Sequence, residues 1–169
     1  FAAFWYFDFK LNYLEMQDKI FTSGGIIRFD FLLFVFADAG AVLLLSVLTA
    51  FFFSRAKARK KGWKFWDKNA RRVLINMMIP LATGGLLVLI MLIHNHVAYL
   101  AGLTMIFYGL ALVNSSKYTF DDIRYLGMFE ILLGLLATVF VGYGLLFWAI
   151  GFGILHIVYG LLIYLRYDR

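Results

Sequence analysis

Two ionisable residues, Glu130 and His156, lie inside apolar stretches of the sequence, each between two glycines at the same spacing. Offsets of three and seven residues place the members of each set on one face of a helix. A carboxyl group and an imidazole that meet inside a membrane can exchange a proton, which is the chemistry that these residue types offer. The two sets are Gly127, Glu130, Gly134 and Gly153, His156, Gly160.

The two segments that carry these sets are expected to form an antiparallel hairpin. Counted from the cytoplasmic ends at ~1.5 Å per residue, Glu130 and Gly160 both lie ~8 Å deep, and Gly134 and His156 both lie ~14 Å deep. Each ionisable side chain should therefore face a glycine of the other helix. Small residues at such spacing also let helix backbones approach closely in lipid. The glycines expected at helix contacts are Gly102, Gly109, Gly127, Gly134, Gly153 and Gly160.

Two interpretations of the ionisable residues remain open. A charged residue inside a span costs roughly 2.5–3.5 kcal/mol on insertion scales, so it usually faces protein. Glu130 and His156 are either a proton-linked or ligand-binding site, or a structural hydrogen-bonded lock between helices. Tyr159 and Asn76 lie at inner depths similar to that of Glu130 and are expected to complete a polar layer. Asp38, in the outer half of an earlier apolar segment, is expected to be a structural acid or a contact to a partner subunit.

Other kinds of site are not indicated. The pair His94 and His96 lacks a third ligand nearby, so no metal site is expected. Haem ligation by two histidines is not expected either, because His156 alone is buried. Cysteine is absent, which excludes disulfides and thiolate chemistry. Since no P-loop, nucleophile elbow, HExxH or dinucleotide motif occurs, we expect neither an enzyme nor a cofactor.

The composition places these residues in a membrane. Of 169 residues, 63% are hydrophobic and 15% are charged, whereas a soluble domain is about half apolar and a quarter charged. Apolar segments of about 17–25 residues cross a bilayer as helices. The sequence therefore predicts an all-α polytopic transmembrane helix bundle, forming a single integral membrane domain over residues 1–169. The five full spans are expected at about 31–54, 73–93, 97–113, 125–141 and 145–165.

The basic loop 55–72 sets the expected orientation. It holds nine of the sixteen Lys and Arg residues, and basic residues in short loops stay on the cytoplasmic side. The C-terminus is then cytoplasmic as well. This clustering accounts for much of the net charge of +6, so nucleic acid is not an expected partner. Residues 1–7 are apolar but too short to span, and we expect the outer end of an additional N-terminal helix or a short interfacial segment.

The same loop contains two tryptophans, which favour a position at the membrane interface. Its basic side chains would then hold anionic lipid headgroups. The alternative is that the loop only sets orientation. The headgroup candidates are Arg55, Lys57, Arg59, Lys60, Lys61, Trp63, Lys64 and Trp66.

Three runs of sequence carry a family resemblance: FYGLALVNSSKY at 107–118, IRYLG at 123–127 and VGYGLLFW at 141–148. Together they resemble a family of uncharacterised Gram-negative inner-membrane proteins of about this size. The similarity covers most of the chain from Arg55 onward. It implies a multi-pass protein of the bacterial inner (cytoplasmic) membrane, with one further N-terminal helix and no assigned activity.

We therefore expect a non-catalytic integral membrane protein, a small accessory or structural subunit of a membrane complex that contacts the lipid bilayer and a protein partner or a second copy. The alternative is a small proton-linked transporter or channel that uses Glu130 and His156. A third interpretation, a membrane enzyme acting on a lipid or a quinone, would use the polar segment 114–122 with Glu130.

Overall fold

The structure is a computed structural model that describes residues 68–94, 96–119 and 122–167, together with isolated helical residues between 33 and 55. The chain divides into two compact units, one of residues 11–70 and one that contains residues 71–169. The helices discussed below belong to the second unit, α4 beginning three residues before it. The isolated residues are Leu33, Ala37, Ala41, Leu44, Leu45, Leu48, Phe52 and Arg55.

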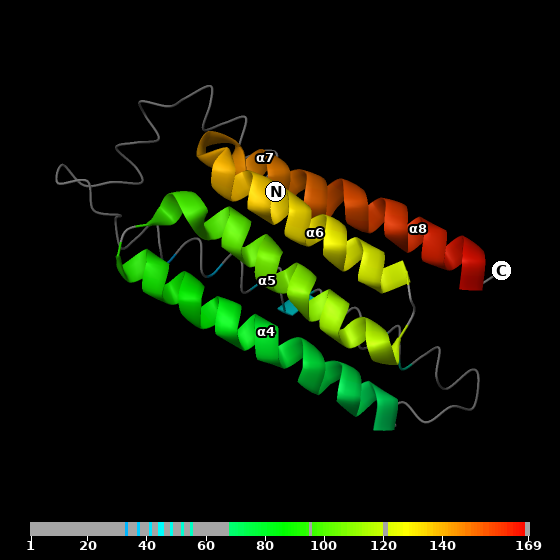
Figure 1. The fold of residues 1–169 in the computed structure, drawn as a ribbon. Coiled ribbons are helices and arrows are strands. Elements are labelled where there is room, and N and C mark those ends of the chain that lie inside the picture. Colours follow the sequence, from blue (N-terminus) through cyan, green and yellow to red (C-terminus); the bar gives the residue numbers. More distant parts are fainter. Residues whose placement is uncertain are drawn as a thin grey trace. The chain divides into compact units, whose positions relative to one another are not determined.

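All regular elements in the described residues are helices, and short turns connect them (Figure 1). The turns after α4 and after α6 fold the chain back on itself, which gives two antiparallel hairpins. The second of them joins the two segments that the sequence predicts to pair. The last span is one continuous helical run in which η4 is a π-helix. The elements are α4 (Lys68–Ile93), η1 (Val97–Tyr99), α5 (Leu100–Ser115), η2 (Ser116–Tyr118), α6 (Asp122–Val139), η3 (Val141–Tyr143), α7 (Gly144–Ala149), η4 (Ile150–Leu155) and α8 (His156–Tyr167).

Three helical segments are long and apolar enough to cross a membrane: Lys68–Ile93, Val97–Tyr118 and Val141–Arg166. They contain the predicted spans 73–93, 97–113 and 145–165. Large apolar side chains cover much of the outer surface of these helices, as expected where lipid replaces water. The chain is therefore a helical membrane protein. The helix over the predicted span 125–141 is α6, whose 18 residues include three charged ones, Asp122, Arg124 and Glu130.

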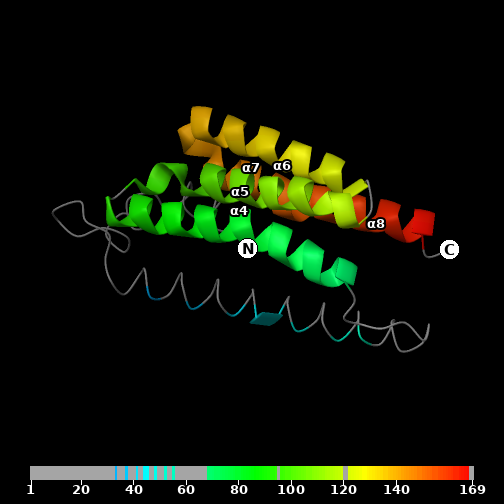
Figure 2. The ribbon, with the colours of Figure 1, turned by 60° about the horizontal axis from the view of Figure 1, so that its bottom comes forward.

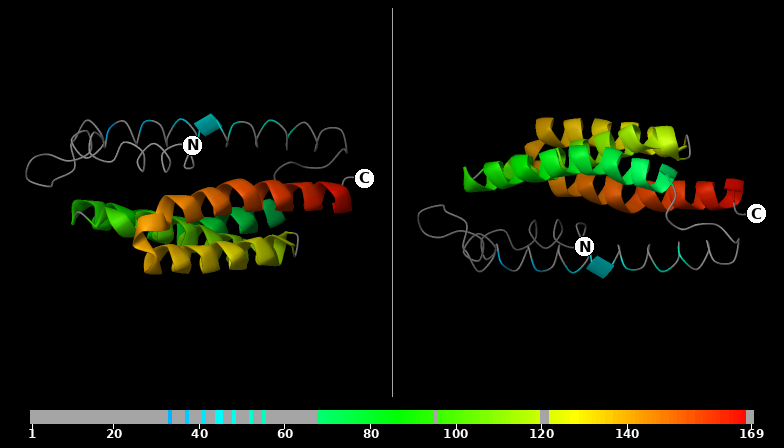
Figure 3. Two further views of the ribbon diagram at one scale, coloured as in Figure 1. Left: turned by 90° about the horizontal axis from the view of Figure 1, so that it is seen from above. Right: turned by 90° about the horizontal axis from the view of Figure 1, so that it is seen from below.

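A close backbone contact joins α5 to α6 through glycine. A Cβ atom added to Gly109 would lie 2.6 Å from the carbonyl oxygen of Gly127, and one added to Gly102 would lie 2.8 Å from that of Gly134. The reverse distances, from Gly127 and Gly134, are 2.7 and 2.8 Å. The backbones are thus close enough for Cα–H···O contacts. These four glycines lie at a helix contact, and the helix that meets Gly127 and Gly134 is α5. The two helices lie side by side in Figure 1, and Figure 3 shows the turn by which the chain passes from α6 into α7.

The helix α4 lies against α5 on the side away from α6 (Figure 1). Gly84 is the buried residue of α4. It lies against Phe107, and a side chain at position 84 would overlap that residue. Nearer the other end of α4, the side chain of Asn114 donates a hydrogen bond of 2.9 Å to the carbonyl of Asn76. Pro80 lies inside the helix, and the helix axis changes direction part-way along (Figure 2), as expected where proline removes a backbone donor.

The helices α7 and α8 complete the bundle on the other side. The former packs against both α5 and α6, and the latter continues along α6. Close to the start of α6, Asp122 pairs with Arg166 of α8 at 3.0 Å. This ion pair is partly exposed, so its contribution to stability is small, at about 0–1 kcal/mol.

Candidate functional site

The candidate site surrounds Glu130, which α6 directs into the space between α5 and η4. The side chain is fully buried. A Cβ atom added to Gly151 would lie 2.6 Å from Oε2 of Glu130 and 2.6 Å from the terminal methyl of Met105. A glycine at position 151 therefore leaves the space that the carboxyl group occupies.

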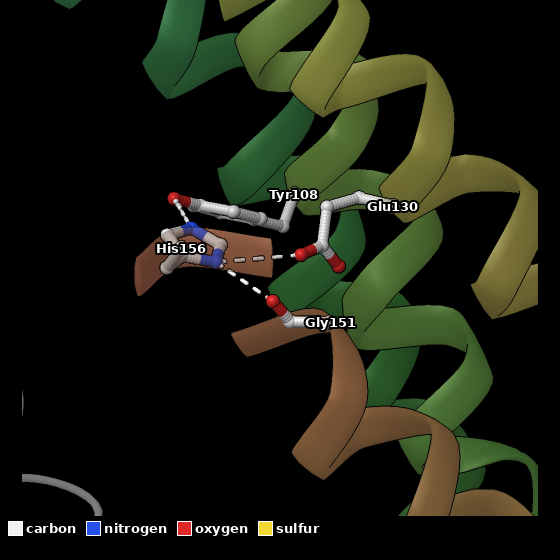
Figure 4. A network of polar contacts seen from close by, with 4 residues as sticks. All are labelled: Tyr108, Glu130, Gly151 and His156. Carbon is white, nitrogen blue, oxygen red and sulfur yellow. Dashed lines mark hydrogen bonds and ion pairs between the residues drawn. The ribbon is translucent and has the colours of Figure 1, made fainter. Parts of the chain in front are cut away.

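His156 lies beside this carboxyl group and contacts all three neighbouring elements (Figure 4). Its Nε2 atom is 2.8 Å from the hydroxyl oxygen of Tyr108 on α5. Its Nδ1 atom is 2.9 Å from the carbonyl oxygen of Gly151 on η4 and 3.5 Å from Oε1 of Glu130 on α6. The imidazole thus lies between a phenol and a carboxyl group, with one ring nitrogen directed toward each.

The hydrogen bond to Gly151 fixes the tautomer of a neutral His156. A carbonyl oxygen accepts hydrogen bonds and cannot donate them, so Nδ1 carries the proton. The unprotonated Nε2 atom then accepts the hydrogen of the Tyr108 hydroxyl. Protonation of the ring would reverse this last bond, since both nitrogens of an imidazolium are donors.

The π-helix η4 places the Gly151 carbonyl within reach of His156. A π-turn closes between residues i and i+5 and takes up one residue more than an α-turn. Residue 151 is five residues before 156, so the wide turn brings them to the same face of the helix. Such turns occur often at functional sites, and here one supplies an acceptor to the imidazole.

The Glu130 carboxyl group is polar and buried but unsatisfied. Neither of its oxygens has a hydrogen-bond partner among the described residues. The distance of 3.5 Å to Nδ1 of His156 allows an ion pair, but it exceeds the usual 2.7–3.2 Å of an N–H···O hydrogen bond. Buried polar groups normally have partners. A carboxyl group without one is therefore suited to accept a proton or another small cationic species.

Aromatic rings cover the imidazole on the side of the π-helix. The ring of Phe152 stacks on that of His156, with centroids 5.6 Å apart, and Tyr108 and Trp148 lie at 4.9 and 4.7 Å from Phe152. The side chain of His156 nevertheless remains 30% exposed, whereas that of Glu130 is 0% exposed. The imidazole therefore connects the buried carboxyl group to the surroundings of the helices.

The structure brings Glu130 and His156 together. The prediction that they face Gly160 and Gly134 is wrong. A Cβ atom added to Gly153 or Gly160 would meet nothing within 4 Å among the described residues. The glycine next to Glu130 is Gly151, and Gly134 contacts α5 and not His156. Gly151 lies nine residues before Gly160, which is about 14 Å along the axis at the rise of an α-helix. The π-helix in addition rotates the residues that follow it by about 100° relative to an unbroken α-helix.

The polar contacts of Asn76 and Tyr159 are elsewhere. The Asn76 side chain donates to the backbone carbonyl of Arg72, one turn earlier in α4. Tyr159 lies near Asp122 and Tyr125 at the start of α6. No described hydrogen bond joins either residue to Glu130.

The remaining sequence candidates fall mostly outside the described residues. These include Asp38 and, apart from the exposed and helical Arg55, all the residues expected to bind lipid headgroups. They are Lys57, Arg59, Lys60, Lys61, Trp63, Lys64 and Trp66.

Two members of the site were not among the sequence candidates. Tyr108 carries a usable signal, since it lies five residues before the end of the predicted span 97–113, ~8 Å deep by helical rise and level with Glu130. Gly151 carries no such sequence signal, because its carbonyl reaches His156 through the π-helix, which the apolar periodicity does not indicate.

Comparisons with known proteins add no assignment: no protein-family model, curated protein or solved structure matches this chain. Within the described residues there is also no group of three or more His, Asp or Glu side chains that could hold a metal ion. The chemistry of the site therefore has to be inferred from its own geometry.

Proposed function

We propose that this protein is a small proton-linked transporter or channel, in which Glu130 takes up and releases a proton inside the membrane. One observation carries the proposal: the Glu130 carboxyl group is fully buried, has no hydrogen-bond partner in the described part of the chain and lies 3.5 Å from an imidazole nitrogen.

The same observation argues against a purely structural lock between helices. A lock stabilises a bundle when its polar atoms are satisfied, whereas an unsatisfied group inside a membrane destabilises it. Glu130 makes no hydrogen bond to α5 or α8, so it contributes little cohesion to balance the cost of its burial. A functional role explains its presence better.

The proposal includes five membrane spans, at about 31–54, 73–93, 97–113, 125–141 and 145–165, in a bacterial inner membrane. The helix α6 serves as the fourth span, since its 18 residues extend ~27 Å, close to the ~30 Å of a hydrocarbon core. Its charged residues Asp122 and Arg124 then lie at the interface. The basic loop 55–72 places the C-terminus in the cytoplasm.

The test is proton flux in liposomes that contain the purified protein. A potassium diffusion potential drives protons inward, and an enclosed pH-sensitive dye reports their arrival. Parent protein should acidify the interior faster than protein-free liposomes, and Glu130→Gln should reduce this rate to the protein-free level. Glutamine keeps the size of the side chain and carries no exchangeable acid proton.

The matched control is Asp122→Asn on the same helix. It also removes one carboxylate, but from a partly exposed position at the first residue of α6, and should retain the parent rate. Parent-like flux in a folded Glu130→Gln protein would contradict the proposal, and so would parent flux no faster than that of empty liposomes.

A second function is that of an accessory or structural subunit. It is favoured by glycines on helix surfaces that contact no other part of the described chain. Cβ atoms added to Gly85, Gly153 or Gly160 would meet nothing within 4 Å, and small residues on such faces are typical of contacts between membrane helices. Native mass spectrometry of gently extracted full-length protein distinguishes the two functions. A defined co-purifying protein would support the subunit, and a lone chain would oppose it.

A further inference from the structure

Glu130 has no direct exposure, so a proton has to reach it through a neighbouring group. Three elements surround the carboxyl group: α5 contributes Met105 and Tyr108, η4 contributes Gly151, and α8 contributes His156. Of these described neighbours, Tyr108 and His156 are ionisable. The imidazole of His156 approaches the carboxyl oxygen at 3.5 Å, and 30% of its side chain is exposed.

The two nitrogens of this imidazole are placed at opposite ends of a path. Nε2 is 2.8 Å from the Tyr108 hydroxyl, and Nδ1 is 3.5 Å from Oε1 of Glu130. Figure 4 shows the ring between the two side chains, with the phenol on one side and the carboxyl group on the other. An imidazole in this position can accept a proton at one nitrogen while it gives up another proton at the second.

We infer that His156 relays protons from the exposed side of the helices to the buried Glu130, an inference that rests on the proposed function. An incoming proton binds Nε2, which gives an imidazolium whose Nε2–H donates to the Tyr108 oxygen. The Nδ1 proton then transfers to Oε1 of ionised Glu130. The products are a neutral carboxylic acid and a neutral imidazole protonated at Nε2, so one proton enters and one proton arrives.

The relay returns to its starting state by a change of tautomer. The Nε2 tautomer has no hydrogen to donate to Gly151. When Nε2 releases one proton to the surroundings and Nδ1 takes one up, the N–H···O bond to Gly151 is restored and Nε2 again accepts from Tyr108. The imidazole is 30% exposed, which allows both protons to be exchanged with the surroundings.

Gly151 and Tyr108 are positioning residues in this relay. The Gly151 carbonyl holds the resting proton at Nδ1, next to the carboxyl group. The Tyr108 hydroxyl keeps Nε2 as the acceptor that receives the next proton. Because the π-helix supplies the Gly151 carbonyl, it determines which of the two nitrogens starts the cycle with a proton.

The test measures how fast Glu130 becomes protonated. The chain has three histidines, so a parent carrying His94→Ala and His96→Ala leaves His156 as the sole imidazole. After a rapid drop in pH, infrared spectroscopy follows the carboxylic-acid band that is present in this parent and absent from its Glu130→Gln derivative. His156→Gln should slow the appearance of the band by about 10²-fold or more, in line with the usual contribution of a positioned proton donor, without changing its final amplitude.

Chemical rescue separates a relay from a structural role. In His156→Ala, added imidazole should restore most of the lost rate, whereas added pyrrole, which has a similar size but no basic nitrogen, should not. Parent-like rates in folded His156→Gln and His156→Ala proteins would overturn the relay. A slowed His156→Ala protein that imidazole does not accelerate would also overturn it.

A measurement on unaltered His156 keeps the inference falsifiable if these variants do not fold. Nitrogen-15 spectra of the His94→Ala, His96→Ala protein at neutral pH should show the Nδ1–H tautomer, and a resting Nε2–H tautomer would overturn the relay. Failure of the proposed function would give different results. In that case the Glu130 band would not respond to pH at all, and parent liposomes would show no added proton flux.

Discussion

A methyl group at position 109 should destabilise the bundle more than the same group elsewhere on these helices. In Gly109→Ala the new Cβ atom would lie 2.6 Å from the Gly127 carbonyl oxygen and 2.9 Å from the Ile131 backbone nitrogen. Ordinary contacts begin near 3.4 Å, so the deficit at the carbonyl is 0.8 Å. Both obstructing atoms belong to the backbone of α6, which cannot rotate away as a side chain does.

The helices have to separate by a large part of that 0.8 Å, and contacts on both sides of the glycine pair weaken as they do. Overpacking of this kind usually costs about 1–3 kcal/mol. The matched control is Gly160→Ala, which meets nothing within 4 Å and gains up to about 1 kcal/mol from the higher helix propensity of alanine. This propensity gain applies to both helix positions and cancels, so the two variants should differ in free energy of unfolding by about 1–3 kcal/mol.

Reversible unfolding in mixed detergent micelles, with increasing SDS and circular dichroism as the readout, measures this difference. Gly109→Ala should unfold at a lower SDS fraction than the parent protein, and Gly160→Ala at the same or a higher fraction. Equal stability of the two alanine variants would refute the conclusion that α5 and α6 are in backbone contact at this point.

Two further substitutions test the attachment of α4 and the space around the carboxyl group. Asn114→Ala removes the hydrogen bond to the Asn76 carbonyl, so it should cost about 0.6 kcal/mol, the average for such bonds in membranes, and increase hydrogen exchange in α4; unchanged exchange would contradict this attachment. Gly151→Ala places a Cβ atom 2.6 Å from Oε2 of Glu130 and from the Met105 methyl, both at the ends of flexible side chains. Stability should therefore change by less than about 1 kcal/mol, while proton flux in liposomes falls. The control is Gly153→Ala, which meets no neighbour. Equal flux in the two variants would contradict the role of Gly151 in leaving space for the carboxyl group.

The sequence indicates which glycines share a helix face, because glycines seven residues apart stay on one face when every turn has the same width. It does not indicate which helix each face meets. Gly127 and Gly134 were expected opposite the last span, but they contact Gly109 and Gly102 of α5.

The last span does not follow this rule. Its π-helix changes the width of one turn, and residue spacing alone does not reveal where such a turn lies. The meeting of Glu130 with His156 was expected from their common placement between glycines, but Gly151 in place of Gly160 was not. Tyr108 was overlooked for a different reason, since an aromatic residue in an apolar helix usually packs against lipid or other helices and seldom holds an imidazole.

The glycine contacts of α5 and α6 also limit which parts of the bundle are free to slide. Carbonyl groups of each helix lie against the Cα atoms of the other at two levels, so a shift along the axis would drive backbone atoms into side chains such as Ile106 and Ile131. This pair carries Tyr108 and Glu130. In the proposed function, a movement that opens the carboxyl group to either side of the membrane would therefore fall to the last helical run, which carries His156 and the wide turn of η4.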